Sequence, residues 1–421
     1  MARLLYSLLF YLALPLVLLR LWRRSRKAPA YAERLGERFG FGAERSERPL
    51  WIHAVSVGET LAIAPLVELL LARQPQLPIL LTTTTPTGAE RVRALFGDRV
   101  EHRYCPYDLP DALNRFLKRT DPRGLIVVET ELWPNMIAAC AARQLPVLVA
   151  NARLSARSAR GYHRFGVLTR PLLRQLSLVA AQHASDGERF VALGLPLERL
   201  QVTGSIKFDI RLPADIEQHG EALRQSWGAG RPVLVAGSTH EGEEQALLAM
   251  LPALRQEHPQ LLLVLVPRHP ERFDRVAELA QQQGYRTARR SLADVDTDSE
   301  VYIGDTMGEL VKFYAAADLC FVGGSLIERG GHNPLEPAML GKPVLMGSQV
   351  FNFAEICRQL AEAGGLTLAE SEDQLQEHLA RLLANPKRAQ QQGLAARQFV
   401  AANQGALEQL YQLVAEQIGP S

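Results

Sequence analysis

The stretch Leu319-Cys-Phe-Val-Gly-Gly-Ser325, with Gly330-Gly-His-Asn-Pro-Leu-Glu336 after it, decides how the rest of this sequence is interpreted. Its apolar start predicts a short buried strand that ends at the first glycine pair. The second pair permits positive φ or a close approach of the backbone to a ligand. Asn333 suits an N-cap and Pro334 suits a first helical turn. We therefore expect a strand, a glycine-rich loop and a helix start whose amides attract anions such as phosphate.

The carboxylate of Glu336 falls in the first turn of that expected helix. It can complement the helix dipole, or it can accept hydrogen bonds from a ribose. Each feature alone is also explained by a capped helix after a turn. In series, and followed by Gly341-Lys-Pro-Val344, the features are more specific and favour a nucleotide site.

Composition places the chain among globular proteins, with 421 residues, enough for two or three domains, and 47% apolar residues. The net charge of +2 gives no case for a nucleic-acid partner. Four scattered cysteines argue against a zinc site or a disulfide framework and fit a reducing compartment. Asp294-Val-Asp-Thr-Asp298 contains two Asp-x-Asp triplets, but it precedes a strand, so we predict a polar loop and no metal site.

The N-terminus carries an uncharged apolar run, Leu4 to Leu19, followed by the basic residues Arg20, Arg23, Arg24, Arg26 and Lys27. The run is slightly shorter than the roughly 20 residues of a full membrane span. A cleaved signal peptide is the alternative, but the positive charges follow the run instead of preceding it. Residues 1–27 are therefore predicted to be a single membrane anchor that keeps the rest of the chain on the cytoplasmic side. Spanning the bilayer and lying in one leaflet both remain open.

From Leu50 onward, short apolar runs alternate with helical stretches, and the pattern restarts at Pro232. This alternation predicts an α/β protein with two Rossmann-like, doubly wound domains. Ligands are expected beyond the carboxyl ends of the strands, facing the cleft between the domains. The predicted ranges are 28–210 for the first domain, 211–230 for a connector, 231–390 for the second domain and 391–421 for a terminal helix that crosses back to the first domain.

Three charged positions at strand ends are candidates for chemistry in the first domain. Glu59 follows a glycine near a helix start, where it serves the helix dipole or acts as a positioned general base. Glu129 and Glu131 follow another strand and would point in opposite directions if that strand continued. Lys207 lies where the first domain ends and has either a charge role or an ordinary surface position.

The second domain offers three similar turns. Ser238 and Thr239 supply hydroxyls and amides at a helix start, and Arg268 and His269 follow a strand. Arginine suits bidentate contacts to phosphate or carboxylate. Met307-Gly-Glu309 marks another helix start that could face a base or a ribose.

Taken in order, these motifs resemble the 3-deoxy-D-manno-octulosonate (Kdo) transferases of Gram-negative bacteria, which are glycosyltransferases of the GT-B architecture. The resemblance runs from the basic-flanked anchor through Ser56-Val-Gly-Glu59, Glu129-Thr-Glu-Leu-Trp-Pro-Asn135, Asn151-Ala-Arg-Leu-Ser155, Gly204-Ser-Ile-Lys-Phe-Asp209 and the turns of the second half. It implies inverting transfer of Kdo from CMP-Kdo to a lipid A precursor of the lipid IVA type. It also implies the cytoplasmic face of the inner membrane, no metal at the reacting centre and no cofactor.

Residue roles follow from the same resemblance. It makes Glu59 the general base and matches Glu129 and Lys207 to positions that stabilise the transition state. The segments that match CMP contacts are Pro267, Arg268 and His269; Met307, Gly308 and Glu309; and Asn333, Pro334, Leu335 and Glu336, with Ser238 and Thr239 as further substrate-binding candidates. Two other classes stay open: another membrane-associated GT-B enzyme that uses a UDP-sugar in envelope synthesis, and a non-catalytic nucleotide-binding membrane protein.

Overall fold

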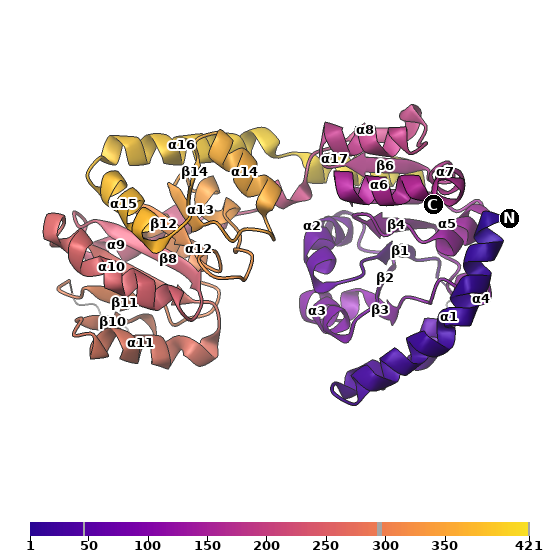
Figure 1. The fold of residues 1–421 in the computed structure, drawn as a ribbon, viewed down its shortest axis with the longest axis horizontal. Coiled ribbons are helices and arrows are strands. Elements are labelled where there is room, and N and C mark those ends of the chain that lie inside the picture. Colours follow the sequence, from indigo (N-terminus) through magenta and orange to yellow (C-terminus); the bar gives the residue numbers. More distant parts are fainter. Residues whose placement is uncertain (45–46, 293–296, 420–421) are drawn as a thin grey trace. The chain divides into compact units, whose positions relative to one another are not determined.

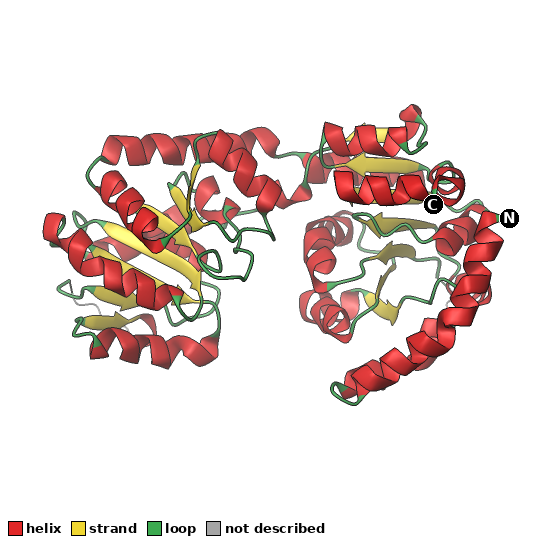
Figure 2. Ribbon diagram, viewed as in Figure 1, coloured by secondary structure: helices red, strands yellow, loops and turns green. Residues whose placement is uncertain are grey.

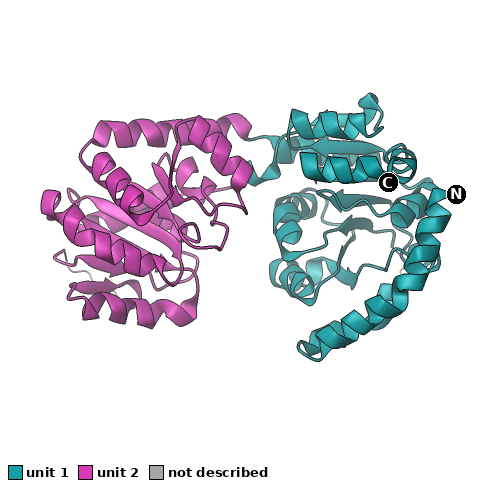
Figure 3. Ribbon diagram, in the orientation of Figure 1, with its two compact units in different colours: residues 1–209, 404–421 teal, residues 210–403 magenta. Residues whose placement is uncertain are grey.

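The computed structural model describes residues 1–44, 47–292 and 297–419, which form two compact units (Figure 3). Unit 1 takes in Met1–Asp209 and the C-terminal residues from Gln404 onward, and unit 2 is Ile210–Asn403. Each unit is built on a parallel sheet of seven strands whose connections are mostly helical (Figure 2).

The sheet of unit 1 has the strand order β3-β2-β1-β4-β5-β6-β7 (Figure 1). Its strands are β1 Leu50–His53, β2 Ile79–Thr83, β3 Glu101–Tyr104, β4 Gly124–Val128, β5 Val147–Ala152, β6 Leu178–Ala181 and β7 Leu200–Val202. Its helices are α1 Ala2–Ser25, α2 Val57–Arg73, α3 Pro86–Phe96, α4 Pro110–Thr120, α5 Pro134–Ala141, α6 Ala156–Arg164, α7 Gly166–Leu173, α8 Ala184–Ala192 and α17 Ala406–Ile418, with single turns η1 Pro29–Ala32, η2 Leu35–Phe39, η3 Gly97–Arg99, η4 Leu197–Arg199 and η5 Ile206–Phe208.

The sheet of unit 2 has the order β10-β11-β9-β8-β12-β13-β14. Its strands are β8 Val233–Thr239, β9 Leu262–Pro267, β10 Thr287–Arg289, β11 Val301–Ile303, β12 Leu319–Val322, β13 Val344–Gly347 and β14 Leu366–Ala369. Its helices are α9 Ile216–Trp227, α10 Glu243–Glu257, α11 Phe273–Gln282, α12 Leu310–Ala316, α13 Leu335–Met339, α14 Ala354–Glu362, α15 Glu372–Leu383 and α16 Pro386–Asn403, with single turns η6 Pro270–Arg272 and η7 Arg290–Leu292.

The central strands carry mostly apolar residues, as expected where helices cover both faces of a parallel sheet. Along β1, Leu50 and Ile52 join one buried cluster, while Trp51 joins the cluster on the opposite face. The sequence did not predict β3, β10 and β14, which are all edge strands. Polar residues fill much of β3 and β10, so these segments lack the apolar run that marks an internal strand.

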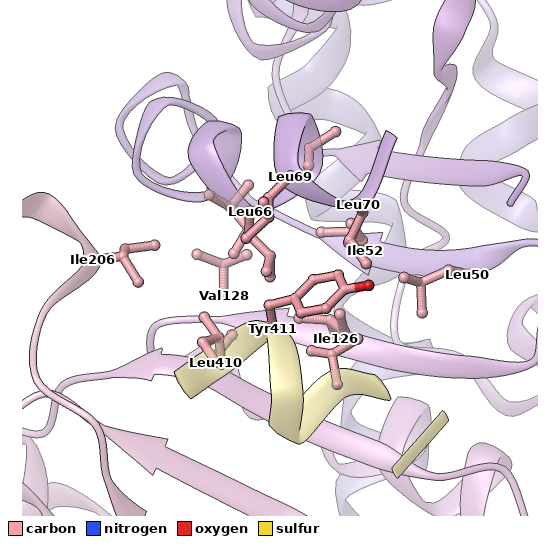
Figure 4. Packing of buried hydrophobic residues seen from close by; sticks show 14 of the residues in the cluster. Leu50, Ile52, Leu66, Leu69, Leu70, Ile126, Val128, Ile206, Leu410 and Tyr411 are labelled. Atoms are coloured by element: carbon pink, nitrogen blue, oxygen red, sulfur yellow. The ribbon is translucent and has the colours of Figure 1, made fainter. Parts of the chain in front are cut away.

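The chain crosses between the units after Asp209 and again after Asn403. The sequence instead predicted a connector at 211–230 and a terminal helix at 391–421. Residues 211–230 lie within unit 2, where α9 packs against α12. The stretch 391–421 is divided between two helices, and only α17 belongs to unit 1. There Leu410 and Tyr411 enter the core beside Leu66 and Ile126 (Figure 4).

One carboxylate holds the start of α17. Asp209, the last residue of unit 1 before the chain enters unit 2, accepts hydrogen bonds from the Gly405 amide at 2.7 Å and the Leu407 amide at 2.8 Å. These amides have no partner inside the helix, so the carboxylate caps it. The chain therefore leaves unit 1 and returns to it at one place.

In each sheet, successive strands are added first toward one edge and then toward the other. In unit 1 the order reverses between β1 and β4, and in unit 2 between β8 and β12. Ligands of doubly wound sheets bind outside the carboxyl ends of the strands at such a switch point. The residues that follow these four strands are therefore the first place to look for a site.

Candidate active site

Glu59 lies in the first turn of α2, directly after β1 at the switch point of unit 1. Its Oε2 accepts a hydrogen bond from the Val55 amide at 2.7 Å, and its Oε1 accepts one from the Ser56 hydroxyl at 3.0 Å. Ser56 is the N-cap of α2, so Glu59 completes a capping arrangement. A carboxylate oxygen has two lone pairs, so both oxygens keep the capacity to accept another proton donor.

Burial raises the pKa of Glu59 to about 7, and the nearby carboxylates of Glu131 and Glu129 add to this effect. The hydrogen bonds from Val55 and Ser56 oppose it. Burial raises the pKa of Glu131 as well. The structure thus brings three acidic side chains from the ends of β1 and β4 into one electrostatic group, of the kind that tunes a carboxylate toward neutral pH.

The backbone at Glu129 changes the geometry expected from sequence. Strand β4 ends at Val128, and Glu129 has a φ of +59°. A non-glycine residue in this region is uncommon and is often found at functional sites. The strand does not continue through Glu131, so the alternation that would point Glu129 and Glu131 in opposite directions does not apply.

Lys207 lies in η5, a single turn that packs against α2, the helix that carries Glu59. Asn151 supports this turn: its Oδ1 accepts a hydrogen bond from the Ile206 amide at 3.3 Å. Asn151 is fully buried, has a φ of +53°, and its Nδ2 has no partner in the part of the chain that the structure describes. The sequence marked Asn151 within a motif but gave no sign of this support.

In unit 2, Ser238 and Thr239 end β8, and Arg268 follows β9. The Arg268 amide donates to the Thr239 carbonyl at 3.0 Å, which joins the two turns. Ser238 has a φ of +56°. The loop after β12 passes so close that a Cβ on Gly323 would lie 2.6 Å from the Ser238 carbonyl oxygen, which explains the glycine.

The Asn333 segment reaches the same edge of the sheet. Asn333 Oδ1 accepts from the Leu335 amide at 3.1 Å, and its Nδ2 donates to Glu336 at 3.3 Å. Burial raises the pKa of Glu336, whereas the Asn333 hydrogen bond and the positive charge of Arg268 lower it. The helix itself is short, Leu335–Met339, and begins one residue later than expected, so its dipole is a weaker anion attractor than the sequence suggested.

Three histidines gather at this edge, although the sequence singled out only His269. The Nε2 atoms of His240 and His332 lie 2.8 Å apart in stacked rings, and the His269 ring meets His240 edge-on. Burial lowers the pKa of His240, and it lowers that of His332 to about 4. The pair is therefore neutral at pH 7, and one ring donates to the other.

Glu309 is held inside unit 2. Its carboxylate pairs with Arg290 at 2.9 Å and Lys312 at 3.1 Å and accepts from the Thr306 hydroxyl at 2.6 Å. These contacts, led by the Arg290 hydrogen bond, lower its pKa to about 2. A ligand at this turn would therefore meet its backbone, including Gly308 with a φ of +80°, and the exposed Met307.

Glu243 is a residue that the sequence analysis missed. Its fully buried carboxylate accepts four backbone hydrogen bonds, from His240 at 3.0 Å, Gly324 at 2.8 Å, Ser325 at 3.0 Å and Leu326 at 3.1 Å. It therefore fixes the glycine-rich loop to the start of α10. The cluster of acidic residues after Gly237-Ser-Thr-His240 was the available signal, but nothing in it separates Glu243 from its exposed neighbour Glu241.

A metal site does not form among the described residues, since no group of three or more His, Cys, Asp or Glu side chains is placed to hold an ion. Asp294 and Asp296 of the Asp-x-Asp triplets lie outside the described residues.

Two doubly wound units, each with a parallel sheet of seven strands and a single switch point, give the chain the GT-B fold. MurG of Acinetobacter baumannii has the same fold, with a TM-score of 0.56 and 15% identity, and the match covers 88% of this chain and 100% of MurG. The UDP-GlcNAc 2-epimerase of Neisseria meningitidis has a TM-score of 0.55 and 15% identity, covering 88% of this chain and 99% of its own.

The particular family follows from sequence. Residues 33–210 match the family model described as 3-deoxy-D-manno-octulosonic-acid transferase, and residues 236–399 match glycosyl transferases group 1. The chain is 43% identical to the 3-deoxy-D-manno-octulosonic acid transferase of Haemophilus influenzae over 98% of both chains, and 38% identical to that of Bordetella pertussis over the full length of both. This chain belongs to the Kdo transferases, enzymes of lipopolysaccharide biosynthesis.

Proposed function

We propose that the enzyme transfers Kdo from CMP-Kdo to a hydroxyl of a lipid A precursor of the lipid IVA type, with inversion at the anomeric carbon. The observation that carries this proposal is Glu59, a half-buried carboxylate with a pKa of about 7 at the switch point of unit 1. Such a pKa lets a carboxylate take a proton near neutral pH.

The proposed reaction is a single in-line displacement. Glu59 takes the proton of the acceptor hydroxyl while the oxygen of that hydroxyl forms a bond to the anomeric carbon of Kdo. The bond from that carbon to the phosphate oxygen breaks at the same time, and CMP leaves with the electron pair. Phosphate is a good leaving group, so one carboxylate is enough for the proton transfer. Glu129 and Lys207 are proposed to stabilise the charge that develops at the reacting carbon and the departing phosphate.

Unit 2 is proposed to bind the CMP part of the donor. Arg268 and the turn of Ser238 and Thr239 supply positive charge and donors for the phosphate. Pro267 and His269 flank Arg268, the backbone of Met307 to Glu309 faces the base or ribose, and Glu336 accepts from the ribose. Asn333, Pro334 and Leu335 hold Glu336 in place.

The acceptor is a lipid, so the enzyme is proposed to work at the cytoplasmic face of the inner membrane, attached by its N-terminus. Among the described helices, α1 alone is long and apolar enough to cross a membrane by length and composition, with a mean hydropathy of 2.1. The basic residues after its apolar run favour the cytoplasmic side for the rest of the chain.

The direct test is incubation with CMP-Kdo and a tetra-acylated lipid A precursor, with the products identified by mass. NMR of the new linkage would report inversion or retention. Transfer from a UDP-sugar instead would favour another envelope glycosyltransferase. CMP binding without any transfer would favour a non-catalytic nucleotide-binding protein.

The pH dependence of transfer gives a second test. Only ionised Glu59 can accept a proton, and its pKa is raised to about 7. The transfer rate should therefore rise with pH through about 7 and reach a plateau above it. Single-turnover rates with saturating donor isolate this step. A rate that stays flat down to pH 5 would show that an ordinary carboxylate, or no carboxylate, is the base.

Arg268→Ala should weaken CMP binding by about 1.5–3 kcal/mol, the range of charge-assisted hydrogen bonds. Arg275→Ala is the matched control, since this exposed side chain pairs with Glu241 at the surface. Calorimetric titration with CMP is the measurement. If both variants bind CMP like the parent protein, the phosphate contact lies away from the turn after β9.

A further inference from the structure

Helix α1 lies along unit 1 (Figure 1), and the burial of its side chains follows one stripe of its surface. The side chains along this stripe recur every three or four residues and are half-buried: Ala2, Tyr6, Phe10, Leu14, Val17, Leu21 and Ser25. This spacing marks one face of a helix from its first turn to its last. The elements that α1 contacts are η1, α5 and α7.

Polar contacts fix the first half of α1 to the body of unit 1. The Ser7 hydroxyl is buried and donates to Asn135 Oδ1 at 3.1 Å. The Tyr6 hydroxyl hydrogen-bonds to Asp108, and the Tyr11 hydroxyl donates to Asp111 at the start of α4. Two of these three acceptors are carboxylates, and hydrogen bonds to charged groups are the stronger kind.

The opposite half of α1 is apolar and exposed. Its uncovered large side chains are Leu4, Leu5, Leu8, Leu9, Leu12, Leu16, Leu18, Leu19 and Trp22, each at least 37% exposed. The exposed basic residues Arg20, Arg23, Arg24, Arg26 and Lys27 lie at the end of the helix. Two further exposed apolar side chains, Phe165 and Val167, lie where α7 begins. An apolar face with adjacent cations matches the surface of an anionic bilayer.

We propose that α1 lies in the plane of the membrane, in one leaflet, and stays docked on unit 1 instead of crossing the bilayer. At about 36 Å, a helix of 24 residues is long enough to span. A spanning α1, however, would place Tyr6, Ser7 and Tyr11 in hydrocarbon. Their partners Asp108, Asn135 and Asp111 belong to the folded domain and cannot follow them there without a large penalty for the charges. Docking and spanning therefore exclude each other.

The docked helix also connects the membrane to the candidate active site. Asp108 accepts from the amides of Asn135 at 3.0 Å and Met136 at 2.8 Å, so it caps α5. Asn135 ends the segment that begins with Glu129 and Glu131. In-plane attachment through α1 would thus hold these carboxylates at a fixed height above the lipid. This part of the inference rests on the proposed transfer to a membrane-borne acceptor.

Thiol labelling tests the arrangement, and the four native cysteines are all buried, so the background is low. Arg3→Cys and the reference Glu188→Cys, both at exposed positions, are treated with a membrane-impermeant maleimide in right-side-out and inside-out vesicles. A docked α1 puts both thiols on one side, so both should react only in inside-out vesicles. Reaction of Arg3→Cys only in right-side-out vesicles, or only after detergent, would overturn the proposal.

A proximity measurement in the same membranes tests the docking contact. A short bis-maleimide should join the two thiols of the Tyr11→Cys and Asp111→Cys double variant. In the control double variant, Leu12→Cys with Asp111→Cys, the Leu12 position is on the exposed face of α1, so the two thiols should be joined much less. Equal cross-linking yields in the two double variants, or no cross-linking in either, would contradict docking. Kdo transfer measured on the unlabelled vesicles keeps the two proposals distinct, because α1 can lie in the plane whether or not transfer occurs.

Discussion

Glu59→Gln is expected to reduce Kdo transfer by about 10²–10⁴-fold, the usual contribution of a general base. Glutamine has nearly the same shape and keeps an amide oxygen for the hydrogen bonds from the Val55 amide and the Ser56 hydroxyl. What it loses is the ability to take a proton. The capping of α2 should therefore survive while the chemistry fails.

Two measurements on the same folded variant make this test specific. The first is the transfer rate with CMP-Kdo, and the second is the dissociation constant for CMP, which should barely change because its proposed contacts lie in unit 2. Glu68→Gln is the control on the same helix, since Glu68 pairs with Arg99 at the surface. A surface pair contributes at most about 1 kcal/mol to stability.

Each alternative outcome has a different meaning. Transfer at nearly the parental rate would remove Glu59 as the base and leave Glu129 and Glu131 as the next candidates. Loss of CMP binding together with transfer would mean that the substitution disturbs the fold.

Glu243→Ala is expected to destabilise unit 2 by at least about 1–3 kcal/mol, the cost of leaving even one buried hydrogen-bond donor without a partner. The variant leaves four amides, of His240, Gly324, Ser325 and Leu326, without their acceptor. The glycine-rich loop should lose its fixed position, so CMP affinity should fall even in conditions where the protein remains folded.

Denaturant unfolding followed by calorimetry with CMP checks both parts of this expectation. Glu241→Ala is the matched control, two residues away but exposed and paired only at the surface with Arg275. A change in the unfolding free energy no larger than that of the control would mean that water replaces the carboxylate without loss. Normal CMP affinity in a destabilised variant would separate the loop from nucleotide binding.

The sequence predicts the internal strands and the residues at their ends because both depend on local patterns. Buried parallel strands are continuous apolar runs, and functional groups follow them at turns rich in glycine and proline. The edge strand β3 escapes this reasoning because Glu101, His102 and Arg103 are polar, although His102 and Arg103 are buried.

Contacts between distant segments were out of reach for a different reason. Asn151 accepts a hydrogen bond from the Ile206 amide, 55 residues away, and so supports the turn that carries Lys207. Glu243 holds a loop that lies about 80 residues further along the chain. Such pairs depend on the order of the strands in the sheet, which no local pattern records. The stripe of α1 that touches unit 1 was equally hidden, because leucine occupies both its covered and its exposed faces.

The place of α17 has a consequence for how the chain folds as it is made. The core of unit 1 includes Ala406, Leu407, Leu410, Tyr411 and Val414, which leave the ribosome after the whole of unit 2. At the usual speed of translation, roughly 5–20 residues per second, unit 2 takes about 10–40 s to be made after Asp209 has appeared. Throughout that time α17 does not yet cover the apolar surface around Leu66 and Ile126. The domain that is synthesised first is thus the last to be completed, and a chaperone that shields it during this interval would act on unit 1.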